Sequence, residues 1–130
     1  MQDRKKRVLA VDDDELIRTM LSRVLSPTYD VTVARNGQEA LEAIRREKPD
    51  LVVLDLRMPV MDGWQFLERL EAAGEDVPVV VLSAEAGKPW PESPLVRARH
   101  PKPGGMEALR VVCARVLADE DTKEEPPKKG

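Results

Sequence analysis

LVVLDLRMPVMDG, residues 51–63, runs from four apolar residues into one carboxylate, Asp55, and then turns at Pro59 and at Asp62-Gly63. A short unbroken apolar run bounded by turn residues is typical of a strand that is buried on both faces, as in a parallel sheet. Asp55 therefore stands where such a strand reaches the surface. Because a buried carboxylate without partners costs roughly several kcal/mol, we expect the rest of the chain to supply partners for it.

Strand-like and helix-like patterns alternate on both sides of this stretch. The predicted strands cover residues 7–11, 29–34, 51–54, 77–82 and 95–99. The predicted helices cover residues 15–25, 38–46, 64–73 and 106–117, and Asp14 is placed to cap the first of them. Strands that alternate with helices predict an α/β fold with a parallel sheet and helices on both of its faces.

The regular pattern fails between Ser83 and Lys102, where prolines and a glycine recur: Gly87, Pro89, Pro91 and Pro94. A proline inside a helix costs about 3 kcal/mol, so we expect no full helix there. Trp90 lies between two of these prolines, where it either covers the core edge that the missing helix leaves or anchors a partner. Residues 87–94 are the candidate for a binding element specific to this protein.

Length and charge limit the classes of function. The 130 residues suit one domain, with a basic arm at 1–6, a folded part at 7–118 and a charged, disordered tail at 119–130. The net charge of -3 and the pI near 5.3 argue against nucleic acid or a membrane as partner. One cysteine excludes an internal disulfide, and no signal peptide or spanning segment is evident, which predicts a soluble cytoplasmic protein.

Four strand ends carry reactive side chains. Asp12-Asp13, Asp55, Ser83 and Lys102 each stand just after a different predicted strand, and in parallel sheets these ends share one ligand-binding edge. Three carboxylates within about 4 Å of one another repel by roughly 4 kcal/mol per pair, so a divalent cation is expected. Oxygen ligands without histidine or thiol favour Mg²⁺. Because a lysine ammonium suits a phosphoryl oxygen, the set describes a phosphoryl acceptor.

Together, these motifs resemble the receiver domain of two-component response regulators over residues 7–118. The segments that carry the resemblance are VDDDELIR, LVVLDLRMPVMDG, VVVLSA and PKPGG, in this order and spacing. The resemblance implies a flavodoxin-like (CheY-like) three-layer sandwich with strand order 2-1-3-4-5 and, here, a degraded or missing fourth helix. It also implies a phosphorelay in which a partner histidine kinase or phosphotransfer protein phosphorylates Asp55 and a downstream protein reads the result.

The resemblance further assigns the metal ligands. Asp13 and Asp55 would bind Mg²⁺ through their carboxylates and Asp12 through a water molecule. Arg57 would contribute its backbone carbonyl only. The domain is then a signalling phosphoacceptor and not an enzyme, apart from its own phosphoryl transfer and dephosphorylation.

The remaining assignments concern the phosphoryl group. Ser83 would hydrogen-bond it and Lys102 would pair with it. Arg57, two residues after the acceptor, and Glu85, two residues after Ser83, would flank the path of the attacking water and modulate how long the phosphoryl group lasts.

Arg99 departs from the family pattern, in which Tyr or Phe usually stands three positions before the lysine. A charged guanidinium is poorly suited to turn inward as that ring does. The alternative interpretation is therefore a pseudo-receiver, an interaction scaffold with the same fold and no phosphorylation-driven switch. A flavodoxin-type enzyme is disfavoured, because the first strand lacks a phosphate loop and the acids would repel an anionic cofactor.

Overall fold

Five parallel strands alternate with helices in the computed structural model, which describes residues 5–83, 92–101 and 105–124. The strands are β1 (Arg7–Val11), β2 (Asp30–Ala34), β3 (Leu51–Asp55), β4 (Val79–Ser83) and β5 (Val96–Pro101). The helices of the described part are α1 (Glu15–Leu25), α2 (Gly37–Arg46), α3 (Gly63–Ala72) and α4 (Met106–Glu124). The sheet order β2-β1-β3-β4-β5 confirms the predicted fold.

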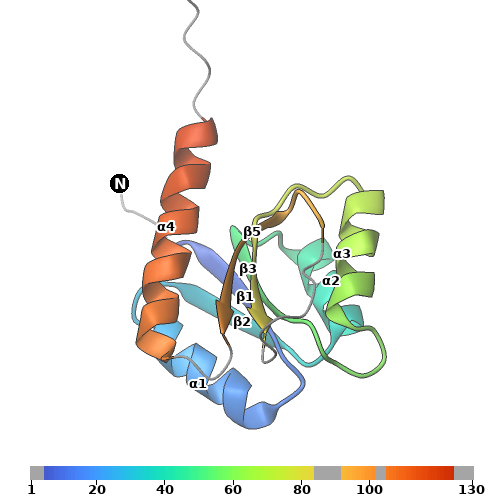
Figure 1. Cartoon of the computed structure of the whole chain (residues 1–130), viewed down its shortest axis with the longest axis horizontal. Helices are drawn as coiled ribbons and strands as arrows, with labels where there is room; N and C mark the ends of the chain where they lie inside the picture. Colours follow the sequence, from blue (N-terminus) through green and yellow to red (C-terminus); the bar gives the residue numbers. More distant parts are fainter. Residues whose placement is uncertain (1–4, 84–91, 102–104, 125–130) are drawn as a thin grey trace, which may run out of the picture.

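The sheet forms the middle of three layers, with α1 and α4 on one face and α2 and α3 on the other (Figure 1). Because successive side chains of a strand point to opposite faces, each strand feeds two cores. In β3, Val52 and Leu54 pack toward α2 and α3, whereas Leu51 and Val53 pack toward α1 and α4. All five residues of β3 are buried, as its unbroken apolar run predicts.

The ends of the elements differ from prediction mainly in the second half of the chain. β5 begins at Val96 because the preceding residues form a turn, in which the backbone N–H of Leu95 donates to Ser93 Oγ at 3.2 Å. Residues 84–91, including Trp90 and most of the predicted binding element, lie outside the described part. The rest of the interval between β4 and β5, residues 92–95, contains no helix.

The last helix is longer than predicted. α4 continues to Glu124, so residues 119–124, which we expected to be disordered, are helical. Two ion pairs tie this extension to the body of the protein: Lys6 Nζ lies 2.8 Å from Asp121 Oδ1, and Arg97 Nε lies 2.8 Å from Glu120 Oε2. These contacts hold the helix beyond its last apolar residue, which a pattern of apolar spacing cannot indicate. In the described ranges, no helix combines the length and apolar character needed to cross a bilayer.

Gly63, the first residue of α3, lies against the end of β3. Its N–H donates to the carbonyl of Leu56 at 3.0 Å. A Cβ atom at this position would stand 2.8 Å from Leu56 Cα and 2.9 Å from the carbonyl oxygen of Asp55. Both neighbours are backbone, so glycine is what allows α3 to begin so close to Asp55.

We predict that Gly63→Ala lowers the free energy of unfolding by about 1–3 kcal/mol, because backbone must move to admit the methyl group. Gly37→Ala is the matched control, since the three atoms nearest to its Cβ would be side-chain atoms of Met61, at 2.9–3.0 Å, and not backbone. We expect a change below about 1 kcal/mol for that variant, helped by the higher helix propensity of alanine. Urea denaturation measures both, and equal losses for the two variants would contradict the argument.

Candidate metal centre at the carboxyl edge of the sheet

Strand register brings three carboxylates together. Val11 of β1 pairs with Leu54 of β3, so the next residues, Asp12 and Asp55, lie side by side at the carboxyl edge of the sheet. One carboxylate oxygen from each of Asp12, Asp13 and Asp55 can be chosen so that all three lie within 4.8 Å of one another. Asp12 is 0% exposed and Asp55 is 3% exposed, while Asp13 is exposed. The acid cluster expected from the sequence is therefore formed.

The donor set of this acid cluster fits Mg²⁺. Octahedral ligands about 2.1 Å from the ion are roughly 3–4.2 Å apart, so the carboxylate oxygens need only a small adjustment to share one ion. At 4.8 Å, two carboxylates repel by about 3.5 kcal/mol at an effective dielectric near 20. Hard oxygen donors favour Mg²⁺ over softer metals, and the exposed side of Asp13 leaves access for water ligands.

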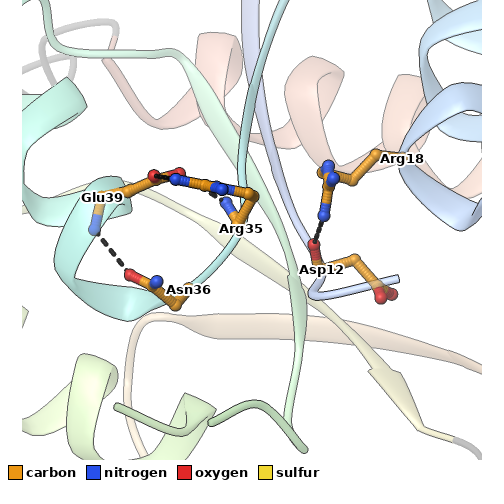
Figure 2. A network of polar contacts seen from close by, with 5 residues as sticks. All are labelled: Asp12, Arg18, Arg35, Asn36 and Glu39. Carbon is orange, nitrogen blue, oxygen red and sulfur yellow. Dashed lines mark hydrogen bonds and ion pairs between the residues drawn. The ribbon is translucent and has the colours of Figure 1, made fainter. Parts of the chain in front are cut away.

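Backbone groups and one arginine orient the acids. The N–H of Asp14 donates to Asp12 Oδ1 at 2.9 Å, and Asp14 itself caps α1 by accepting from the N–H of Leu16, as predicted. Arg18 donates from Nη1 to the carbonyl oxygen of Asp12 at 2.9 Å (Figure 2). The N–H of Arg57 donates to Asp55 Oδ1 at 3.3 Å. The acids are thus held by backbone N–H groups of the turns that follow them and by Arg18 of α1.

The predicted phosphoryl-binding residues are described only in part. Ser83 is the last residue of β4, next to Leu82, which pairs with Asp55. The side chain of Ser83, together with Glu85 and Lys102, lies outside the described part of the chain. Arg57 is exposed in the loop after β3. The structure therefore brings together the acids of the predicted site, and the roles of the other residues stay predictions.

Arg99 and His100 are neighbours in β5, but Arg99 is exposed and His100 is buried on the opposite face of the sheet. Arg99 is exposed and pairs with Val81, so it stands on the α2 and α3 face of the sheet. His100 is 6% exposed, and its Nε2 lies 3.1 Å from the carbonyl oxygen of Gly105. Since a carbonyl only accepts, Nε2 carries the hydrogen. The alternation along β5 could have shown that His100 shares the buried side of Ala98.

The loop between β3 and α3 contains a strained residue that the sequence did not indicate. Val60 has a φ of 68°, and the N–H of Met61 donates to the carbonyl of Pro59 at 2.7 Å, which closes a γ-turn around Val60. Such a turn is rare and strained, above all at a β-branched residue. Val60 is 80% exposed while Met58 and Met61 are buried, so the turn lets both methionines reach the core.

A flavodoxin-like sheet with three acids gathered at its carboxyl edge defines the class of signalling domains that the sequence resembles. The family model of the response regulator receiver domain matches residues 8–93. The chain belongs to this family, whose members are signalling domains of two-component systems.

Relatives and solved structures agree with this assignment. The response regulator MprA of Mycobacterium leprae is 47% identical over 79 residues, which are 60% of this chain and 35% of that protein. MprA of Mycobacterium avium is 44% identical over 79 residues, which are again 60% of this chain and 35% of that protein. The match therefore spans about a third of these relatives.

Among solved structures, the chemotaxis protein CheY4 of Vibrio cholerae has a TM-score of 0.75 and 30% identity, covering 87% of this chain and 99% of that one. NtrX from Brucella abortus has a TM-score of 0.82 and 26% identity, covering 94% of this chain and 29% of that one.

We predict that Val60→Gly raises the free energy of unfolding by about 0.5–1 kcal/mol. Relief of roughly 1–2 kcal/mol of left-handed strain exceeds the added entropy of the unfolded glycine chain, and the exposed valine side chain contributes little packing. The control is Val33→Gly, at an exposed valine inside β2, which should be destabilising. Urea denaturation of both variants tests this, and a loss of stability in Val60→Gly would count against strain at this turn.

Proposed function

We propose that this chain is a Mg²⁺-dependent phosphoacceptor in a His-Asp phosphorelay, with Asp55 as the acceptor. The observation that carries the proposal is the acid cluster, in which oxygens of Asp12, Asp13 and Asp55 lie within 4.8 Å of one another in a chain of the receiver family. A histidine kinase or phosphotransfer protein is the donor, and a downstream protein receives the signal through direct contact. A cytoplasmic location belongs to the same proposal.

The chemistry needs one nucleophile and charge compensation. An oxygen of Asp55 attacks the phosphorus of a phosphohistidine in line; the new P–O bond forms as the P–N bond breaks, and the electron pair stays on the histidine nitrogen. Asp12 and Asp13 would hold the metal beside this oxygen, and bound Mg²⁺ would offset the negative charge on the phosphoryl oxygens. Ser83 and Lys102 complete the proposal by their family positions.

A pseudo-receiver scaffold is the second candidate, and the observation in its favour is Arg99. An exposed arginine on β5 occupies the position at which the family usually carries an aromatic ring. A scaffold of this kind would bind its partner equally with and without phosphate. The acid cluster favours the phosphoacceptor, because a scaffold has no need to hold three like charges together.

Incubation with Mg²⁺ and acetyl phosphate tests the acceptor directly. We expect intact-mass spectrometry to show the addition of one phosphoryl group, dependent on Mg²⁺ and absent in Asp55→Asn. Asp13→Asn removes an exposed metal ligand and should slow the reaction while the protein remains folded.

The outcomes of this experiment separate the candidates. Modification that persists in Asp55→Asn would mean that another residue is the acceptor. No modification of the wild-type protein, under conditions in which a known receiver reacts, would favour the scaffold.

We further predict that Arg57→Ala speeds the loss of phosphate about three- to tenfold, equivalent to about 0.7–1.4 kcal/mol of barrier. The exposed side chain lies two residues after the acceptor and would screen it from water, while the backbone N–H that contacts Asp55 Oδ1 is kept in the variant. Decay of the phosphorylated species, followed by mass spectrometry, gives the rate. Arg45→Ala, an exposed arginine of α2, is the control, and an unchanged decay rate in Arg57→Ala would remove the idea.

A further inference from the structure

Arg18 connects helix α1 to the acid cluster by a hydrogen bond to the main chain of Asp12 and not to its carboxylate. Its guanidinium donates to the main-chain oxygen of Asp12 at 2.9 Å, and the carboxylate of Asp12 points away from it (Figure 2). An arginine paired with the carboxylate itself would compete with a cation for those oxygens. This contact instead fixes the backbone of Asp12. Other groups orient its carboxylate.

Within the described part of the chain, three hydrogen bonds hold Asp12 in place. Its N–H donates to the carbonyl of Ala34 at 3.1 Å, its Oδ1 accepts from the N–H of Asp14 at 2.9 Å, and its carbonyl accepts from Arg18. The first contact ties the residue to β2, the second to the turn before α1 and the third to the first turn of α1. Asp12 is 0% exposed, so its backbone cannot rotate without disturbing all three.

The charge of Arg18 also acts on a carboxylate of α2. Glu39, at the start of α2, accepts hydrogen bonds from Arg35, and its N–H donates to Asn36 Oδ1 at 2.9 Å (Figure 2). These bonds from Arg35 are the main reason that the pKa of the Glu39 carboxyl is lowered, and the charge of Arg18 lowers it further. A carboxylate thus stands within electrostatic reach of Arg18 on the side of α2.

From this geometry we infer that Arg18 is a positioning residue of the metal centre: by holding the Asp12 carbonyl, it sets Asp12 and Asp13 against Asp55 for one divalent cation. The inference rests on the proposed function in that the cation is Mg²⁺. Arg18 touches neither the ion nor the phosphoryl group in this role. It acts through the main chain that carries two of the three acids.

An experiment can tell whether Arg18 acts by positioning the acids or by its charge, because its removal would change cation affinity in opposite directions in the two cases. If Arg18 acted only through its positive charge, its removal would leave a more negative acid cluster and tighten cation binding. If it positions the acids, its removal loosens the Asp12-Asp13 turn and weakens binding. Loss of a residue that orients metal ligands typically weakens metal affinity by about ten- to a hundredfold.

The experiment is a titration of the folded protein with MgCl₂, followed by amide NMR shifts and without any phosphodonor. We expect Arg18→Met to weaken Mg²⁺ binding about tenfold, which is about 1.4 kcal/mol, and Arg18→Lys to recover part of the loss because it keeps a donor. Arg23→Met removes the same charge from an exposed position of α1 and should leave the affinity unchanged. Arg18→Gln repeats the test with a polar side chain if Arg18→Met does not fold.

Phosphorylation by acetyl phosphate then provides a second readout. In Arg18→Met, the Mg²⁺ concentration for half-maximal rate should rise by the same factor, while the rate at saturating Mg²⁺ changes by less than about twofold. A merely structural defect would not divide the effect in this way.

Equal or tighter Mg²⁺ binding in Arg18→Met would overturn the inference, as would failure of both Arg18→Met and Arg18→Gln to fold. The proposed function fails differently. If the wild-type protein binds Mg²⁺ but accepts no phosphoryl group, the proposed phosphoacceptor function is wrong, and the positioning role of Arg18 is unaffected.

Discussion

Repulsion among three carboxylates is the constraint on which the rest of the structure depends. Asp12, Asp13 and Asp55 repel one another by about 3–4 kcal/mol per pair at an effective dielectric near 20. A flexible chain would relieve this by moving the acids apart. Here one buried acid, Asp12, follows β1 and the other, Asp55, ends β3. These strands are paired in the middle of an apolar sheet with helices on both faces, so the like charges stay together. The sheet thereby prepares a site whose natural complement is a small dication.

Local backbone features at the strand ends also help to position the acids. They differ in kind from the apolar packing of the core. Gly63 lets α3 start against the carbonyl of Asp55, and the strained turn at Val60 brings the loop back to the core within a few residues. On the other side, Asp14 and Arg18 fix the turn after β1. Each of these features is a backbone contact or a backbone conformation. The apolar core thus determines which strands are neighbours, and these contacts determine where the acids point.

This division explains what the sequence could and could not predict. Helix faces and the meeting of Asp12 with Asp55 follow from apolar periodicity and from the rule for parallel sheets, and they were predicted. The strand order was predicted only through the resemblance to the receiver family. The γ-turn at Val60 and the hydrogen bond from Arg18 to Asp12 were missed, because each depends on a contact or dihedral angle without a periodic signature. The extension of α4 was missed for the same reason, since ion pairs from Lys6 and Arg97 hold it.

The acid cluster and Arg99 lie in different parts of the sheet. The acids belong to β1 and β3, in its centre, whereas Arg99 lies on β5, at the edge, separated from β3 by β4. A change of side chain at β5 therefore leaves the paired strands that gather the acids untouched. It follows that a departure from the family pattern at Arg99 bears on how a partner would sense the modified domain and carries no weight against Asp55 as acceptor. The phosphoacceptor and the pseudo-receiver thus differ in whether phosphate changes the binding of a partner, and the argument for the former rests on why a protein would retain three mutually repelling charges in the acid cluster.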